Sequence, residues 1–420
     1  MFRRVLPSLV VMALAAFAAA CGGGGDASDF ELPPFWVQTD IAAGDLDGDG
    51  RADIASVAML AGPALRRQGY LRIYRQTSPG AFAFSQYLVG TYPWRVAMAD
   101  IDGDAAPDLL VLDANGPNGE NIGRLWLLRQ DPANRGVFRA PELIYTMASI
   151  TYDMAVVDAD RDGAPDIVLS TGLGGTDGAT LLAQDSARRG TFRSPTSLAF
   201  PGRAGAVGVG DLNGDGVPDL AFYASVSTGS PLASAGYTVL LYGQAGGGYG
   251  NMIAGLAPQV GLNSELVRIV DTNSDGRPDV LTVFMQQSTD YTSKVTVLVQ
   301  TAPGAFAGVD STLGALRGRD GFVVADLNHD GRADIGVTGF FPTGSPTVVR
   351  AETSLLFPVG GGAFGVAAIY SMPVSTESIT AADLDGDGYV DLVLQGGDNQ
   401  AYVMQQAPNA PGAFLPLRAL

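Results

Sequence analysis

The sequence predicts an all-β fold, a seven-bladed β-propeller of four-stranded blades. Three observations lead to this prediction. An acidic nine-residue motif occurs seven times, at intervals of 53 to 60 residues. Short apolar runs rich in β-branched residues flank each copy, as expected of buried strands. No helical period follows residue 20. Repeat units share one continuous core, so the chain is expected to form one ring rather than two or three separate domains.

The motif first appears at residues 45–53 as Asp-Leu-Asp-Gly-Asp-Gly-Arg-Ala-Asp. The seven copies, named loop 1 to loop 7, span residues 45–53, 100–108, 158–166, 211–219, 271–279, 326–334 and 383–391. Positions one, five and nine are Asp in every copy, and position three is Asp or Asn. Oxygen side chains at every second position of a tight turn can converge on one hard cation, and a backbone carbonyl at position seven completes the sphere of a calcium loop. The loops are therefore predicted to be calcium-binding hairpins with up to seven structural Ca²⁺.

The predicted ligands fall into five sets. Position one supplies Asp45, Asp100, Asp158, Asp211, Asp271, Asp326 and Asp383. Position three supplies Asp47, Asp102, Asp160, Asn213, Asn273, Asn328 and Asp385. Position five supplies Asp49, Asp104, Asp162, Asp215, Asp275, Asp330 and Asp387. The carbonyl at position seven belongs to Arg51, Ala106, Ala164, Val217, Arg277, Arg332 and Tyr389. Position nine supplies Asp53, Asp108, Asp166, Asp219, Asp279, Asp334 and Asp391.

Position six is Gly in six loops, because so sharp a turn needs a backbone conformation that is cheap only without a Cβ. Loop 2 has Ala105 there, so its site is expected to be the weakest. An EF-hand is not expected, because position twelve carries no Glu and the flanks are strands. The remaining alternative is that such Asp/Gly-rich segments are only good hairpin turns.

The formal net charge of −18 is explained by these loops. Twenty-five of the 43 acidic residues stand at the predicted ligand positions, and seven Ca²⁺ would bring the net charge to −4. An acidic chain of this kind is unfavourable for nucleic acid and for anionic lipid surfaces. No nucleic-acid partner is therefore expected.

The first residues have the form of a secretory signal. Residues 1–20 begin with two arginines and continue as a short apolar run, which predicts a signal peptide rather than a spanning helix. The residues before Cys21 resemble a bacterial lipoprotein box, although Ala18 stands where that family usually has Leu. Cys21 is the only cysteine, so no internal disulfide can form. Residues 21–29 are predicted to be a lipidated cysteine and a flexible tether, which implies export across the inner membrane and an outer-membrane or cell-surface lipoprotein. Membrane contact is expected only through this anchor.

The propeller is assigned to residues 30–420. In the first unit, strands are expected at residues 30–44, 54–59 and 70–76, with a fourth ending near residue 89. A Gly-x-Phe turn precedes the fourth strand and recurs with its glycine at Gly80, Gly136, Gly190, Gly304, Gly362 and Gly412. The tail, residues 415–420, could form the outer strand of the first blade and so close the ring. The competing interpretation is an open solenoid of hairpins.

The units resemble FG-GAP/VCBS repeats, the blades of integrin α-subunit propellers and of many secreted bacterial proteins. The resemblance rests on the Asp-x-Asp/Asn-x-Asp-Gly-x-x-Asp loops and the Gly-x-Phe turns, and it covers residues 30–420. It implies calcium in the hairpin between the first two strands of each blade, on one face of the ring. In integrins the partners use the opposite face. Because one fold carries many functions, the resemblance does not identify a ligand.

No catalytic arrangement is visible. His329, the only histidine, stands at loop position four, a slot that accepts many residues and is expected to face solvent. A Ser-His-Asp or Cys-His site is therefore not available, and Lys294 is the only lysine. We expect a monomeric, non-enzymatic binding or adhesion module whose partner is a protein or carbohydrate at the cell surface. The alternative is a lectin or polysaccharide lyase on the same ring.

A specific ligand is expected to bind where the sequences of the seven units differ. The connections from second to third strand vary most, at residues 113–124, 225–235, 286–294 and 340–349, and are expected opposite the calcium loops together with Tyr92, Trp94 and Tyr152. Loops on a rigid ring often carry recognition, and exposed aromatic rings suit sugar or protein contacts. The alternative is that these are tolerated insertions whose aromatic rings pack between the blades.

Overall fold

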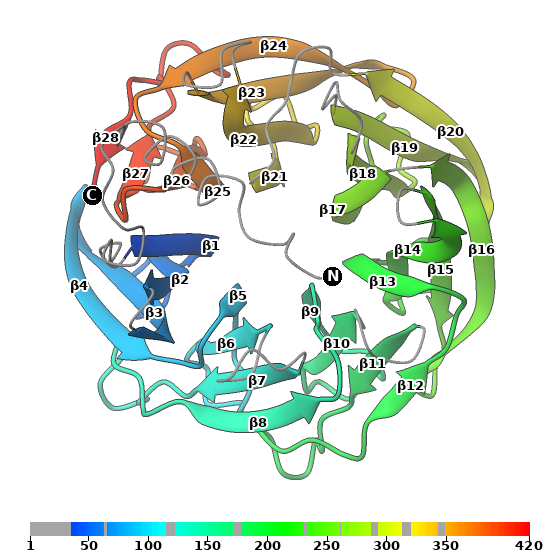
Figure 1. The fold of residues 1–420 in the computed structure, drawn as a ribbon, viewed down its shortest axis with the longest axis horizontal. Coiled ribbons are helices and arrows are strands. Elements are labelled where there is room, and N and C mark those ends of the chain that lie inside the picture. The colour runs from blue at the N-terminus through cyan, green and yellow to red at the C-terminus, as the bar shows by residue number, and fades with distance from the viewer. Residues whose placement is uncertain are drawn as a thin grey trace, which may run out of the picture.

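In the described part of the chain, 28 β-strands form seven four-stranded sheets around a central axis (Figure 1). The computed structural model describes residues 35–62, 65–114, 122–170, 178–230, 233–260, 262–286, 293–312, 321–342 and 349–420. All described regular structure is strand, without a helix. The all-β, seven-bladed propeller predicted from the repeats is therefore confirmed.

The four strands of a blade run outward from the axis in chain order. The first strands are β1 (Phe35–Gly44), β5 (Pro93–Ala99), β9 (Met154–Val157), β13 (Arg203–Gly210), β17 (Leu262–Val270), β21 (Gly321–Ala325) and β25 (Thr376–Ala382). The second strands are β2 (Asp53–Gly62), β6 (Asp108–Asp113), β10 (Asp166–Ser170), β14 (Asp219–Ser230), β18 (Asp279–Gln286), β22 (Asp334–Pro342) and β26 (Asp391–Gly396). Every second strand thus begins at position nine of its acidic loop.

The outer half of each blade is less regular. The third strands are β3 (Leu65–Ser78), β7 (Gly123–Leu128), β11 (Ala179–Leu182), β15 (Ala233–Gly243), β19 (Ser293–Ala302), β23 (Val349–Gly360) and β27 (Ala401–Met404). The fourth strands are β4 (Ala81–Leu88), β8 (Glu142–Met147), β12 (Thr196–Leu198), β16 (Tyr249–Val260), β20 (Ala305–Thr312), β24 (Ala363–Met372) and β28 (Arg418–Ala419). Blades 3 and 7 therefore have the shortest outer strands.

All strand pairs within a blade are antiparallel, as the hairpin prediction required. In blade 1, Gly44 lies opposite Asp53, so residues 45–52 form the turn between β1 and β2. Every acidic loop joins the first strand of its blade to the second, and the blades repeat with the same connectivity around the axis. The seven loops therefore lie on one face of the ring, here called the loop face. The first strands begin on the other, the opposite face.

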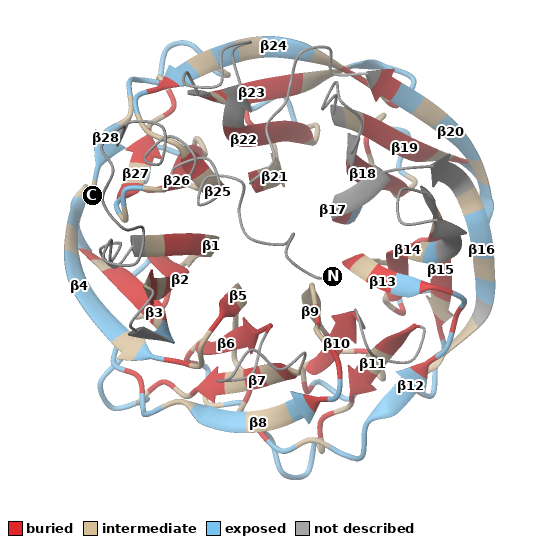
Figure 2. Ribbon diagram, viewed as in Figure 1, coloured by how far each residue is buried: buried red, intermediate tan, exposed pale blue. Residues whose placement is uncertain are grey.

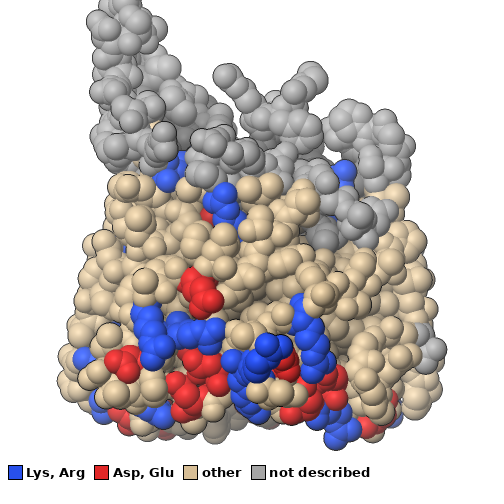
Figure 3. Space-filling view, turned by 90° about the horizontal axis from the view of Figure 1, so that it is seen from below, with Lys and Arg blue, Asp and Glu red and all other residues tan. Residues whose placement is uncertain are grey.

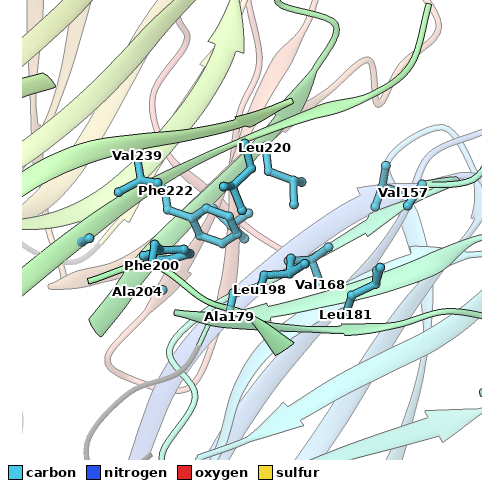
Figure 4. Close-up of a cluster of buried hydrophobic side chains, with 14 residues drawn as sticks. Val157, Val168, Ala179, Leu181, Leu198, Phe200, Ala204, Leu220, Phe222 and Val239 are labelled. Atoms are coloured by element: carbon cyan, nitrogen blue, oxygen red, sulfur yellow. The ribbon is translucent and has the colours of Figure 1, made fainter. Parts of the chain in front are cut away.

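The core of the molecule lies between the blades (Figure 2). Second strands such as β6 and β26 are buried along their whole length, because each is packed on both sides by a neighbouring blade. Figure 4 shows one interface, where Val168 and Leu181 of blade 3 approach Phe222 and Val239 of blade 4. Comparable clusters of buried apolar side chains fill the other junctions. This continuous series of interfaces supports a closed ring rather than an open solenoid.

The ring closes by packing and not by strand exchange. β28 pairs with β27 inside blade 7, and blade 1 is complete with its own β4, so the expected role of the tail in blade 1 is wrong. Ile41 and Ile54 of blade 1 pack instead against Val393 and Val403 of blade 7. The physical reason is that β4 already occupies the outer edge that the tail would need.

Several predicted features lie outside the described residues. These are the signal peptide at residues 1–20, Cys21 and its tether to residue 29, and residues 30–34 of the predicted first strand. The centres of the variable connections, residues 115–121, 231–232, 287–292 and 343–348, also lie outside them. Within the residues that the structure describes, no helix is both long and apolar enough to cross a membrane.

Candidate metal centres

Position nine anchors each loop to its blade. The buried Asp53 carboxylate accepts the backbone N–H of Leu46 at 3.0 Å and that of Gln76 at 2.7 Å, so it joins loop 1 to strand β3. Burial raises the pKa of Asp53 to about 6, although these two N–H groups act in the opposite direction. Position nine of the other six loops accepts the N–H of position two in the same way. This predicted ligand therefore also has a structural role.

Position one organises the turn itself. Asp45 Oδ1 accepts the N–H of Gly48 at 2.7 Å, and Asp45 Oδ2 accepts that of Gly50 at 2.9 Å. The bond from position six to position one recurs in the other loops. The backbone is thus wrapped around one carboxylate, which brings positions three and five to the same side as position one.

Positions four and six both have left-handed backbone. In loop 1, Gly48 and Gly50 have φ values of 75° and 84°. Ala105 keeps this conformation at position six of loop 2, with φ 65°, and its N–H still bonds to Asp100. The expectation that position four accepts many residues needs correction, because Arg161, Ser274 and His329 also have φ values near 60° there. His329 is exposed, as expected, and lies with its ring 4.8 Å from that of Tyr389.

The carboxylates converge in four loops. The sets Asp45–Asp47–Asp53, Asp100–Asp102–Asp108, Asp158–Asp160–Asp166 and Asp383–Asp385–Asp387 each offer three oxygens within 4.8 Å of one another. Loops 4, 5 and 6, which are described in full, contain no such set of three carboxylates, because position three is Asn213, Asn273 or Asn328. Asn still offers an amide oxygen, a ligand type that hard cations accept. The carbonyls at position seven stay a prediction.

Loop 1 contains a buried carboxylate oxygen that has no hydrogen-bond partner among the described residues. The Asp47 side chain is 9% exposed, and its Oδ1 has no hydrogen-bond partner among the described residues. Asp102 Oδ1, at the same position of loop 2, is also buried without a described partner. A buried carboxylate oxygen without a partner is costly, so a cation bound at this point would stabilise the loop. The residues present therefore fit the ion that the spacing predicts.

Glutamines at the ends of third strands connect loops 1, 4, 6 and 7 to the next blade around the ring, a role that the sequence did not predict. Gln130 Nε2 donates to the carbonyl of Leu46 in the preceding blade at 2.9 Å. The same bond joins Gln300 to Leu212 and Gln406 to Leu327. The recurrence of Gln at this point of the repeat was the available signal.

The Gly-x-Phe turn also has a structural reason. A Cβ at Gly136 would lie 2.6 Å from Arg75 Cδ and 3.3 Å from Asp47 Cβ of the preceding blade. Gly136 therefore lets blade 2 approach loop 1. Gly190 makes the corresponding close approach to Arg129 of blade 2. The recurrence of the turn is visible in the sequence, but its contact with the preceding blade was not predicted.

Aromatic rings gather on the opposite face, near the junction of blades 1, 2 and 7. Tyr92 and Trp94 stack with centroids 5.8 Å apart, and the Arg95 guanidinium lies 5.6 Å from the Trp94 ring. Tyr92 is buried between blades, whereas Trp94 is half-buried and its Nε1 has no partner among the described residues. In the first strand of blade 1, Trp36 contacts Tyr70. The expected aromatic surface is thus present in part, and Tyr92 belongs to the core.

Comparison with known proteins supports the predicted repeat family. Residues 271–337, which run from the start of loop 5 through loop 6, match the model of the FG-GAP-like repeat. A stretch of 217 residues, 47% of this chain, is 24% identical to human integrin alpha-6 and covers 18% of it. The resemblance to FG-GAP repeats is confirmed. The matched stretch is less than a fifth of the integrin, and the lipoprotein resemblance stays a prediction.

Several solved structures are similar to this chain at low sequence identity. An exotype rhamnogalacturonan lyase, YesX, is 11% identical, with a TM-score of 0.49 over 89% of this chain and 72% of the lyase. The Dos1 propeller is 12% identical, with a TM-score of 0.48 over 92% of this chain and 86% of its own. The rhamnogalacturonan lyase PL11 of Bacillus licheniformis is 14% identical, with a TM-score of 0.48 over 89% and 72%.

Proposed function

We propose that this ring of FG-GAP-like repeats is a calcium-stabilised binding or adhesion module of the cell surface. Calcium, when bound in the acidic loops, would cross-link carboxylates that otherwise repel one another. An ion that binds only the folded state stabilises it by RT ln(1 + [L]/Kd) at each site. Extracellular calcium modules bind at about 10⁻⁴ to 10⁻³ M, so millimolar calcium outside the cell would load them.

Loop 1 carries the proposal. Its three carboxylates offer oxygens within 4.8 Å, and the buried Oδ1 of Asp47 has no described partner. A simple hairpin turn has no need to bring three carboxylates together, and the hydrogen bonds that Asp45 and Asp53 accept from the backbone leave the Asp47 oxygen unused. Oxygen-only donors on short side chains suit Ca²⁺ rather than zinc or copper, which prefer nitrogen and sulfur.

A binding role fits the rest of the molecule better than catalysis. The one histidine is exposed on the loop face, and it is turned toward Tyr389 rather than toward a nucleophile. The ring is rigid, because every junction between blades is packed, and its opposite face presents Trp36 and Trp94. Loops and aromatic side chains held by a rigid scaffold are a common form of recognition surface.

The location and partners belong to the same proposal. We infer a monomer exported across the inner membrane and held at the outer membrane or cell surface by lipid on Cys21. The partner is a surface protein or carbohydrate, with no nucleic acid, because the chain is strongly acidic. A calcium supply of this order exists outside the cell, which is where the proposed loops would need it.

Binding to immobilised glycans and to intact cells, measured in calcium and in EGTA, tests the proposal. Trp94→Ala is expected to weaken binding, whereas Phe84→Ala, which removes an aromatic ring that is 56% exposed on outer strand β4, should leave it unchanged. Loss of wild-type binding in EGTA is expected as well. Equal binding by wild type and Trp94→Ala would place the ligand elsewhere, and no binding in calcium would contradict the adhesion role.

A carbohydrate-active role is the second candidate. Burial raises the pKa of Glu377 to about 7, and burial also raises the pKa of Tyr92, to which the charge of Glu377 adds a smaller contribution. A carboxyl group with a pKa near neutral is suited to general acid–base catalysis. Incubation with polyuronates distinguishes the candidates, because a lyase releases unsaturated products that absorb in the ultraviolet and a lectin does not.

A further inference from the structure

Arginines contact the position-three carboxylate in loops 1, 2 and 3. Arg75 Nη1 lies 3.3 Å from Asp47 Oδ2, and Arg129 Nη1 lies 3.2 Å from Asp102 Oδ2. In loop 3, Arg193 Nη1 lies 3.3 Å from Asp160 Oδ2 and its Nη2 lies 3.4 Å from Asp162 Oδ2. Figure 3 views the ring edge-on from the side of β7, β8 and β12, and arginine and acidic side chains alternate there along one margin.

These arginines reach the carboxylate from two different places in the blade. Arg75 and Arg129 each precede the glutamine that ends the third strand, Gln76 or Gln130. Blade 3 has Ala183 at that position and uses Arg193 instead, directly after its Gly-x-Phe turn. Two sequence positions thus supply the same contact, which indicates that the contact itself matters more than the local backbone.

The arginine accompanies the extra carboxylate. Loops 4, 5 and 6 have Asn at position three, and within their described contacts no arginine pairs with that residue. Loops 1, 2 and 3 have four carboxylates each, one more than loops 4 to 6. An arginine beside the fourth carboxylate offsets the additional negative charge, since opposite charges a few ångströms apart favour the ionised form.

Loop 7 departs from this rule. It has four carboxylates, but Asp385 Oδ2 accepts a hydrogen bond from the neutral Gln405 Nε2 at 3.1 Å. Gln405 precedes Gln406, so it occupies the position of Arg75 and Arg129. Among the described residues, no arginine forms an ion pair with loop 7. This loop therefore has the largest uncompensated negative charge, and it adjoins blade 1 at the seam of the ring.

The arginines and a bound cation would use different oxygens. Arg75 and Arg129 contact Oδ2 of Asp47 and Asp102, while Oδ1 of each is buried without a described partner. The arginine therefore fixes the side chain and leaves the second oxygen directed into the loop. It reduces carboxylate repulsion when calcium is low, and its positive charge opposes the ion when calcium is high.

We propose that Arg75, Arg129 and Arg193 are resident counter-ions that make loops 1 to 3 less dependent on calcium, and that loop 7 is the loop whose structure depends on calcium most. They are positioning residues for the metal sites of the proposed function, on which this inference rests. Calcium at loop 7 would then act on the seam where blades 7 and 1 meet.

Thermal unfolding of the purified protein in EGTA and in saturating calcium tests the first part with Arg75→Gln. Its matched control is Arg139→Gln, which removes the same charge from an exposed residue that has no ion pair in the described structure. Arg75→Gln is expected to lower Tm in EGTA more than Arg139→Gln and to increase the rise in Tm that calcium produces. The apparent calcium affinity of loop 1 in Arg75→Gln should increase about three- to tenfold. This factor corresponds to the interaction energy of two unit charges a few ångströms apart near a protein surface.

The reciprocal change tests loop 7. Gln405→Arg places the missing arginine beside Asp385 and is expected to raise Tm in EGTA and to reduce the rise produced by calcium. Gln400→Arg adds the same charge at an exposed position in the turn between β26 and β27 and should do neither. Equal behaviour of each variant and its control would overturn the inference. A wild-type protein without any calcium-dependent rise in Tm would instead contradict the proposed function itself.

Discussion

Gln76 Nε2 donates a hydrogen bond of 2.8 Å to the carbonyl oxygen of Leu384, across 308 residues of chain. This bond joins blade 1 to loop 7, at the junction where the two ends of the chain meet. Gln130, Gln300 and Gln406 make the equivalent bond between blades that are consecutive in the chain. Blades 7 and 1 exchange no strand and meet through side-chain contacts. The last junction therefore uses the same glutamine bond as the junctions between blades 1 and 2, 4 and 5, and 6 and 7.

Gln76→Leu is expected to weaken the seam. The buried Leu384 carbonyl would lose its described partner, which costs about 1 to 2 kcal/mol of unfolding free energy. Gln300→Leu removes the matching bond to Leu212 between blades 4 and 5, which are consecutive in the chain, and serves as the control. Hydrogen exchange should become faster in β1 and β25 for Gln76→Leu alone. Equal hydrogen-exchange rates of β1 and β25 in the two variants would show that the junction of blades 7 and 1 does not open independently of the other junctions.

Ala105→Gly is expected to stabilise the protein. Ala105 has φ 65°, a conformation in which glycine avoids the penalty of a Cβ, so the change should add about 1 kcal/mol of unfolding free energy. Ala106→Gly, one residue later, should instead destabilise, because it removes a buried methyl group and adds backbone freedom to the unfolded chain. Denaturant unfolding in EGTA measures both. A loss of stability in Ala105→Gly would show that loop 2 does not carry the strain inferred from its backbone.

Asp215→Ala is expected to lower Tm in calcium much more than Asp104→Ala. Both residues stand at position five, but loop 4 has Gly216 at position six where loop 2 has Ala105, so the site in loop 2 should be the weaker one to begin with. Thermal unfolding in millimolar calcium compares the two variants. Similar losses would contradict the ranking of the sites.

The Glu377 side chain is expected to make the stability of the protein depend on pH. Burial raises its pKa from the ordinary 4.5 to about 7, while the Gln38 N–H, 3.1 Å from Oε2, lowers it. The folded state therefore holds this proton more tightly than the unfolded state, and the associated stability is present below pH 4.5 and is lost as pH rises through 7. The loss should be on the order of 1 to 3 kcal/mol.

Glu377→Gln should remove that pH dependence and be more stable than wild type at pH 8. The amide oxygen can still accept the Gln38 N–H, so the local geometry can be retained. Tm measured from pH 5 to pH 8 in EGTA gives the comparison. Parallel curves for the two proteins would mean that Glu377 does not titrate in this range.

Much of the fold could be predicted because the seven loops mark the repeat, and Asp at position nine marks the start of every second strand. The closure of the ring could not, because the tail at residues 415–420 has strand-like residues but β4 already occupies the edge it was assigned to. The arginine contacts of Arg75 and Arg193 were not foreseen either. They depend on how the third strand, or the Gly-x-Phe turn, of a blade lies against that blade's own acidic loop, which spacing along the chain does not reveal.

Position four shows a second limit. His329, Arg161 and Ser274 suggested a tolerant slot, whereas the structure gives all three a left-handed backbone. Residue variety at a position indicates that side chains have room, and it says little about backbone strain. The predicted ligands at positions one, three and nine do come together in loops 1, 2 and 3, because alternate residues of a tight turn point to one side.

The central claim is that calcium holds the loops, and a calcium titration of thermal unfolding from an EGTA baseline tests it most directly. Magnesium at the same concentrations is the control, because its smaller octahedral shell suits these loops less well. A rise in Tm of many degrees at millimolar calcium, with a much smaller effect of magnesium, is the predicted result. An unchanged Tm across the titration would contradict the account and leave the loops as acidic turns without a metal.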